Sequence, residues 1–184
     1  MNLSFVEDFL QKLCFGSLSF TIFVFLFRIC IRFFEIRIFD FKQLNKIEQY
    51  LPIVSNLILV LLLIIRWIEA SHFPLSNLFE SLLFLTWTIT FIHSILLKIE
   101  KVNSTNLKDN SYTAKFSIIL APFALFTYSF AIFNLPAKMQ QWSFLLPALQ
   151  SNWLLMHVSS MIFSYAILLS GSLFSLLFLI YYQN

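Results

Sequence analysis

Residues 154–182 read LLMHVSSMIFSYAILLSGSLFSLLFLIYY, and this stretch contains no Asp, Glu, Lys or Arg. A helix that crosses a lipid bilayer needs about 20 predominantly apolar residues. The stretch from Leu154 to Tyr182 is longer than one such crossing, so we expect a membrane helix that is tilted or extends beyond the bilayer. The sequence therefore predicts an integral membrane protein.

The composition of the whole chain agrees with this prediction. Its 184 residues are 59% hydrophobic and 11% charged, with a mean hydropathy of +0.83, whereas soluble domains carry about 25% charged residues. The formal net charge of +3 is too small to indicate nucleic acid as a partner. Cys14 and Cys30 form no C-x-x-C pair, and two cysteines cannot make a structural zinc site.

Four further apolar runs predict four more membrane helices, separated by polar stretches. Pro52 is tolerated in the first turn of the second helix, and Asn77 can cap the third helix with Glu80 three residues later. Arg28 and Arg32 lie near the end of the first run, from which we expect them to snorkel outward. The predicted fold is an all-α bundle of five membrane helices in a single membrane domain, with helices at 13–34, 52–67, 78–97, 116–133 and 154–182.

The basic residues predict the orientation, because cytoplasmic loops of membrane proteins carry an excess of Lys and Arg. With the amino terminus outside and the carboxy terminus inside, only Lys12, Arg66 and Lys138 lie on the outer side. The other basic residues then lie inside: Arg28, Arg32, Arg37, Lys42, Lys46, Lys98, Lys101, Lys108 and Lys115. Residues 67–76 and 134–152 are therefore predicted to be outer segments.

These two outer segments contain specific strings, HFPLSNL at His72–Leu78 and PALQSNW at Pro147–Trp153. With the Arg66-Trp67 step and Ser170-Gly171-Ser172-Leu173, they closely resemble the CcsA family of system II cytochrome c biogenesis proteins, found in plastids and many bacteria. The resemblance covers most of the chain, in order. It implies a protein that handles haem on the outer membrane face and attaches it to apocytochrome c.

The resemblance also implies partners and a compartment. The expected cofactor is haem, and the expected partners are apocytochrome c and a system II membrane protein of the CcsB type. The expected location is the chloroplast thylakoid membrane with the outer segments in the lumen, and a bacterial cytoplasmic membrane is the alternative. The family's tryptophan-rich WWD segment is absent, so we expect an amino-terminal portion or a shortened family member that does not attach haem alone.

His157 is the candidate axial ligand of haem iron, because the family's WWD segment is flanked by two external histidines and His157 matches the first. The alternative is a boundary histidine that binds water and the 150–152 loop. Trp153, four residues earlier, lies on the same helix face. It can stack on the porphyrin or serve as an anchor in the aromatic belt.

Three other residues allow two interpretations each. His72 can guide haem or contact a partner, or it can help to fold its loop. Arg66 can bind a haem propionate, or it can pair with Glu69 or Glu80. His93 can have a functional role as an ionisable residue within the membrane, or, as we expect, it can pack as a neutral side chain near the inner interface. A stripe of mostly small residues in the last helix is expected to pack against another helix: Ser160, Ser164, Leu168, Gly171 and Ser175.

Three functions are therefore open from the sequence. The first is a haem-handling assembly factor whose work is binding and orientation, with no catalytic side chain assigned. The second is a haem transporter with His93 and His157 as stations on the two sides. The third is a shortened structural subunit that binds a partner membrane protein and no haem.

Overall fold

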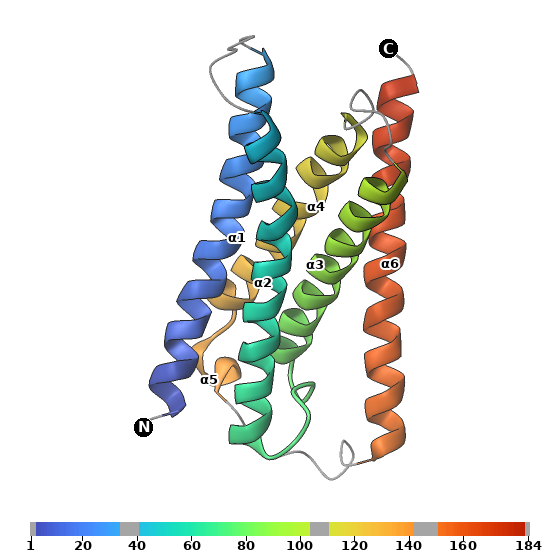
Figure 1. Ribbon diagram of the computed structural model, residues 1–184. Coiled ribbons are helices and arrows are strands. Elements are labelled where there is room, and N and C mark those ends of the chain that lie inside the picture. The colour runs from blue at the N-terminus through green and yellow to red at the C-terminus, as the bar shows by residue number, and fades with distance from the viewer. Residues whose placement is uncertain (1–2, 34–40, 104–110, 142–150, 183–184) are drawn as a thin grey trace.

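The computed structural model describes residues 3–33, 41–103, 111–141 and 151–182 of the chain. The described part is all-α, as predicted, and Figure 1 places the amino and carboxy termini at opposite ends of the bundle. The elements in chain order are α1 (Leu3–Phe33), α2 (Phe41–Ala70), α3 (Leu78–Asn103), α4 (Ser111–Ser129), the π-helix η1 (Phe130–Asn134), α5 (Ala137–Gln140) and α6 (Asn152–Tyr182).

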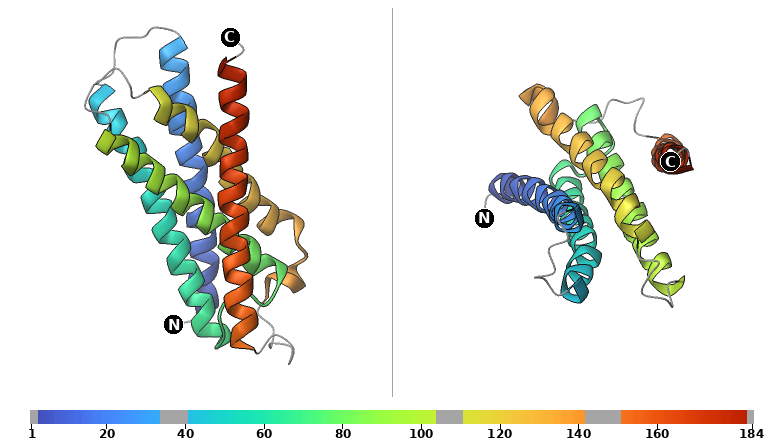
Figure 2. Two further views of the ribbon diagram at one scale, coloured as in Figure 1. Left: turned by 90° about the vertical axis from the view of Figure 1, so that its right-hand side faces the viewer. Right: turned by 90° about the horizontal axis from the view of Figure 1, so that it is seen from above.

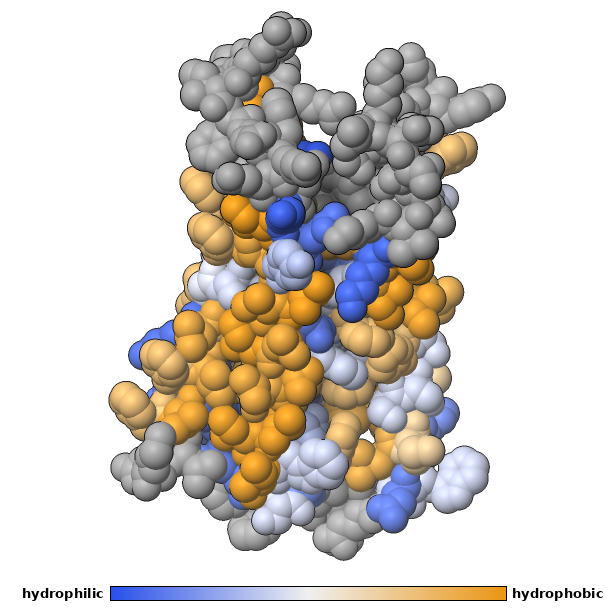
Figure 3. Space-filling view, in the orientation of Figure 1, coloured by the Kyte–Doolittle hydropathy of each residue, from blue (hydrophilic) through white to orange (hydrophobic). Residues whose placement is uncertain are grey.

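Four helices are long and apolar enough to cross a membrane. The apolar segments are Phe5–Ile31 in α1, Lys46–Ala70 in α2, Leu78–Ile99 in α3 and Asn152–Ile180 in α6. A shorter apolar segment, Ile119–Asn134, is formed by α4 together with η1. Hydrophobic side chains gather over the middle of the molecule in Figure 3. The chain is therefore an all-α membrane protein with four to five spanning helices.

Four helices extend beyond the apolar runs expected from the sequence. The expected start at Leu13 is preceded by almost three further turns of α1. Pro52 lies inside α2 because that helix begins at Phe41, and α4 begins at Ser111, five residues before the expected start. The third helix continues from Leu97 to Asn103. Hydropathy locates only the part of a helix that crosses the bilayer. The polar residues at the ends, mostly Lys, Glu and Gln, are good helix formers and extend the helices into water.

The longer α2 supplies a partner for Arg28. The Arg28 guanidinium forms an ion pair with the carboxylate of Glu48, which lies in the added amino-terminal part of α2. Both side chains are largely buried. A buried charge needs such a partner, because removing it from water is costly. Arg32 lies in α1, and its side chain is outside the described part.

The helices form two neighbouring pairs with α6 standing at one side. Figure 2, seen from above, shows α1 beside α2, α3 beside α4, and α6 apart from both pairs. The first two pairs also contact each other, through α2 with α3 and α1 with α4, whereas α6 packs mainly against α3 and less against α4. The core between the pairs contains Cys14, Leu59, Leu83, Leu120 and Tyr128.

Polar side chains join the helices in the interior. Such hydrogen bonds between membrane helices contribute about 0.6 kcal/mol each on average. Asn56 Nδ2 of α2 donates to Trp87 O (3.0 Å) and Thr90 Oγ1 (2.9 Å) of α3. The hydroxyls of Thr86 and Thr127 lie 3.1 Å apart and connect α3 with α4. Because each bond joins residues of different helices that are far apart in the sequence, these contacts fix the relative rotation of the helices.

An aromatic cluster attaches α6 to α3. The ring of Phe163 packs edge-on against Phe84, Trp87 and Phe91, with centroid distances of 5.9–6.4 Å. Ala166 and Ser170, further along α6, are buried as well. One face of α6 is thereby fixed towards α3, and this decides where the other residues of α6 point.

Candidate functional site

The outer segments of the sequence analysis lie at one end of the bundle, which we call the Arg66 end. Here α1 begins, α2 ends, α3 and α6 begin, and the short α5 lies near the start of α1 and the end of α2 (Figure 1). Described residues 71–77 and 135–141 lie at this end, and much of the PALQSNW string lies outside the described residues. This grouping agrees with the predicted alternation of the loops, and the membrane face that this end occupies stays a prediction.

Arg66 is the centre of the Arg66 end and is buried, with 2% of its surface exposed. Its Nη1 forms an ion pair with Glu7 of α1, and its Nη2 lies 3.4 Å from Oε1 of Glu80 in α3. The same Nη2 donates to the carbonyl oxygen of Gln140 in α5 at 2.9 Å. The guanidinium also lies 4.7 Å from the centre of the Phe79 ring. One side chain of α2 therefore joins α1, α3 and α5.

Glu80 is fully buried and orders the turn before α3. Its Oε2 accepts hydrogen bonds from the backbone nitrogen of Ser76 (2.8 Å) and from the Ser76 hydroxyl (2.7 Å). The side chain of Asn77 caps the helix, because Oδ1 accepts from the backbone nitrogen of Glu80 at 2.9 Å. The predicted cap is confirmed. Glu80 therefore connects the HFPLSNL turn directly to Arg66.

Gln140 connects residues 135–141, the second segment at this end, to Arg66. Its Nε2 donates to the carbonyl oxygens of Ile132 (2.8 Å) and Leu135 (2.9 Å), where η1 ends. Asn77 Nδ2 donates to Met139 O at 3.0 Å in the same region. The two outer segments, far apart in the sequence, thus hold each other through side-chain contacts with backbone carbonyls. These carbonyls need donors because the end of a helix leaves them unpaired.

His72 belongs to a compact turn. Its Nδ1 lies 3.2 Å from the carbonyl oxygen of Phe73, and Ser71 adopts a left-handed backbone conformation with φ 56°. The Phe73 ring packs against Trp67 and Phe84 at centroid distances of 5.2 and 6.0 Å. These contacts support the loop-folding interpretation of His72, and its half-buried position leaves part of the imidazole accessible.

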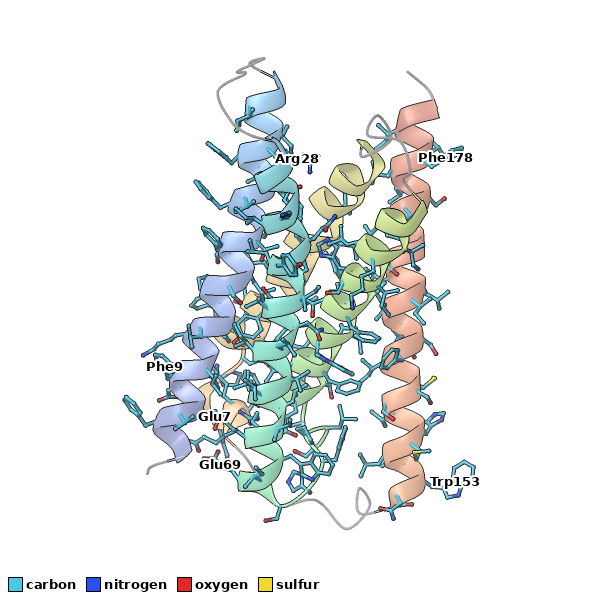
Figure 4. All side chains as sticks on the ribbon, in the orientation of Figure 1. Glu7, Phe9, Arg28, Glu69, Trp153 and Phe178 are labelled. Atoms are coloured by element: carbon cyan, nitrogen blue, oxygen red, sulfur yellow. The ribbon has the colours of Figure 1, made fainter. Side chains whose placement is uncertain are left out.

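His157 and Trp153 lie on the side of α6 that faces away from the bundle. The helix rotates about 100° per residue, so His157, nine residues before the buried Ala166, lies on the opposite face of α6. Both side chains are exposed, Trp153 by 84%, and Figure 4 shows Trp153 pointing away from the other helices. The imidazole of His157 makes no hydrogen bond within the described part of the chain. Its ring nitrogens are therefore available for binding, and a histidine nitrogen is a ligand that haem iron can take.

The structure does not gather the four predicted residues into one pocket. Arg66 is engaged by carboxylates between α1, α2 and α3, His72 lies in the turn before α3, and His157 with Trp153 faces outward from α6. For Arg66, the contacts support the pairing with Glu80 over the pairing with Glu69. Three or more His, Cys, Asp or Glu side chains placed to hold a metal ion together do not occur among the described residues. Among the described residues, His157 presents its imidazole at an exposed helix face.

The Arg66 end also contains an acidic hollow of about 550 Å³. Glu7 and Glu69 lie near each other at this end of the bundle in Figure 4. The hollow is lined by Glu7, Asp8, Gln11, Glu69, Ala137, Gln140 and Gln141. None of the four residues predicted to bind haem lines it. Its negative side chains disfavour the propionates of a haem.

The contacts of Glu7 and Gln140 with Arg66 were not predicted from the sequence. Glu7 precedes Arg66 by 59 residues along the chain, and no periodicity or motif relates them. The one available signal was an acidic side chain at the start of an apolar helix, which needs a basic partner once it is buried. Gln140 carries no such signal, because a polar residue in a loop is unremarkable.

Comparison with known proteins identifies relatives along the whole chain. The profile of the family described as Cytochrome C assembly protein matches residues 75–184. A protein of Pyropia yezoensis named "Cytochrome c biogenesis protein CcsA" is 42% identical over 98% of this chain, and one of Mesostigma viride with the same name is 38% identical over 100%. A third, from Chlamydomonas reinhardtii, is 50% identical over 71% of the chain.

The matched regions make up 51%, 54% and 35% of these three relatives. The chain therefore spans between about a third and about a half of the length of the curated relatives it matches. No solved structure gives a significant match.

Proposed function

This chain belongs to the cytochrome C assembly protein family, and we propose that it acts in the biogenesis of c-type cytochromes, at the step of haem attachment. Its part is to bind or deliver haem on the outer, lumenal face of the membrane. The observation that carries the proposal is the exposed imidazole of His157, one turn inside α6 and within the matched region of the family.

In this proposal His157 would hold haem through a bond from an imidazole nitrogen to the iron. When bound, haem supplies the vinyl groups that become linked to cysteine thiols of apocytochrome c. Trp153 lies one turn before His157 on the same face of α6, where its indole can cover the porphyrin. Neither of the other two histidines is placed to share this role, because His93 is buried in α3 and His72 is held in its turn.

We assign supporting roles to Arg66 and His72. The guanidinium of Arg66 is occupied by Glu7, Glu80 and the Gln140 carbonyl, so we assign it to holding the outer segments in place. His72, half-buried at the same end, is assigned to the folding of its own turn, which its contact with the carbonyl oxygen of Phe73 supports. The proposed partners are apocytochrome c and a membrane protein of the CcsB type. The proposed location is the thylakoid membrane, supported by relatives from photosynthetic organisms.

The test compares His157→Ala with the matched variant His72→Ala in the complete gene product. We expect His157→Ala to reduce the haem absorption of the purified protein and the level of covalently haem-bound cytochrome c in cells. Membrane insertion should be unchanged, and His72→Ala should retain most of both signals. Undiminished haem absorption and cytochrome c maturation in His157→Ala would exclude the ligand role. A protein purified without haem that still supports an assembled partner complex would identify the structural subunit instead.

A further inference from the structure

Residues 135–141, which we call the strap, form one side of the acidic hollow at the Arg66 end. The lining of the hollow comes from α1 and α2, with Glu7, Asp8, Gln11 and Glu69, and from the strap, with Ala137, Gln140 and Gln141. The hollow therefore lies between the strap and the ends of two membrane helices, and it is enclosed on that side only while the strap stays in place.

Polar contacts attach most of the strap to the bundle. Leu135 packs partly against the core, but α5, which follows it, has no buried residue. Two side chains hold the strap by its backbone: Arg66 Nη2 donates to Gln140 O at 2.9 Å, and Asn77 Nδ2 donates to Met139 O at 3.0 Å. A charged donor forms the stronger hydrogen bond, so Arg66 is the main anchor of the strap.

The same guanidinium is linked to more carboxyl groups than its single charge can balance. Arg66 forms ion pairs with Glu7 and Glu80. Glu7 is in turn a side-chain hydrogen-bonding partner of Glu69, and Figure 4 shows the two side chains near each other. An ionised carboxylate is only an acceptor, so two carboxyl groups can share a hydrogen bond only if one of them carries a proton. The contact between Glu7 and Glu69 therefore contains one proton.

Other charged groups nearby do not supply a substitute for this proton. Asp8 adds a further carboxyl group to the lining of the hollow. The other titratable groups described on α1, α4, α5 and the turn before α3 lie outside that lining: Lys12, Cys14, His72, Tyr128 and Lys138. The charge balance of the hollow therefore depends on the proton that Glu7 and Glu69 share.

We propose that the strap is a proton-controlled closure of the Arg66 end, closed while Glu7 and Glu69 share a proton and released when that proton passes to water. Deprotonation makes Glu69 a second charged acceptor for Arg66, and the two lie three residues apart on α2, where side chains can meet. A guanidinium binds a carboxylate more strongly than a neutral carbonyl. The Nη2 group therefore leaves Gln140 O, and the strap loses its main anchor.

This inference rests on the contacts of the Arg66 end and not on the proposed haem binding. The strap belongs to the predicted outer segment 134–152, which ends next to Trp153. Protons on that side of the membrane therefore control how tightly this segment is held to the bundle.

The experiment measures the distance between a spin label on the strap and one on α1 by double electron–electron resonance. The labels are attached at Lys138→Cys and Lys12→Cys, both exposed positions, in the complete gene product in lipid nanodiscs, with its native cysteines replaced by Ser. We expect a single short distance at acidic pH and a longer distance that gains population as the pH rises. Because one proton is released, the ratio of long to short distances should rise about tenfold per pH unit.

Two matched variants identify the group that titrates. Glu69→Gln retains a neutral hydrogen-bond donor beside Glu7 and has no proton to lose, so the short distance should persist at every pH. Asp8→Asn removes a carboxyl group from the same lining but leaves the shared proton in place, so the response to pH should be retained. A wild-type distance that does not change with pH would overturn the proposal. So would a response that survives in Glu69→Gln or disappears in Asp8→Asn.

A third variant tests the strap as the moving part. Asn77→Asp loses the donor to Met139 O, which weakens the closed state, so the longer distance should appear at lower pH than in the wild type. A transition at unchanged pH would contradict the closure by the strap. None of these readouts depends on haem, so the closure and the haem proposal can fail separately.

Discussion

The guanidinium of Arg66 and the carboxylate of Glu80 meet 3.4 Å apart in the buried interior of the Arg66 end, although they belong to different helices. Fourteen residues separate them in the chain, and the HFPLSNL turn lies between them. Because Glu80 also accepts two hydrogen bonds from Ser76, this one contact holds the turn against the end of α2. The HFPLSNL turn is thus attached to a buried ion-pair cluster.

We expect Arg66→Met to destabilise the protein by about 3–5 kcal/mol, because it leaves Glu7 and Glu80 buried without a positive partner. The measurement is the free energy of unfolding in detergent. The control is Lys138→Met, which removes an exposed charge at the same end and should change stability little. Combining Arg66→Met with Glu80→Gln should recover part of the loss. Equal stability of Arg66→Met and Lys138→Met would contradict the role of the cluster.

Asn77 performs two tasks that two substitutions can separate. Asn77→Ala removes both the cap on Glu80 N and the donor to Met139 O, and loss of such a cap costs about 1 kcal/mol. Asn77→Asp retains the cap and loses only the donor. We therefore expect unfolding midpoints in the order wild type, Asn77→Asp, Asn77→Ala, from high to low. If Asn77→Asp is as unstable as Asn77→Ala, the link to Met139 outweighs the cap.

The polar contacts between α2 and α3 should contribute measurably to stability. Asn56→Leu removes the hydrogen bonds to Trp87 O and Thr90 Oγ1, and at about 0.6 kcal/mol per bond we expect a loss of about 1 kcal/mol. Ser160→Ala is the control, because its hydroxyl bonds only to its own helix. Both are compared by equilibrium unfolding in detergent. A stabilising effect of Asn56→Leu would show that packing outweighs these bonds.

The predicted orientation places the Arg66 end on the outer face. With Cys14 and Cys30 replaced by Ser, Lys138→Cys is exposed at that end and should react with a membrane-impermeant maleimide added from outside. Lys101→Cys, near the opposite end of α3, should react only after the membrane is opened. The reverse pattern of labelling would invert the topology while leaving the helix packing as described.

The sequence alone determined the class of protein, the approximate position of every spanning helix and the cap at Asn77. These features depend on local properties, namely apolar length and the pairing of a side chain with a backbone group a few residues away. The pairing of Arg66 with Glu80 was also within reach, because few acidic residues lie near it in the sequence.

Only the tertiary structure decided the rest. Glu7 pairs with Arg66, and Glu48 pairs with Arg28, because packing brings helices together that are distant in the sequence. No local pattern encodes that proximity. The face of α6 was undetermined for a physical reason. Lipid is as apolar as a protein core, so hydrophobicity does not show which side of a membrane helix faces the bundle. The contact of Phe163 with α3 fixes that side, and it turns His157 outward.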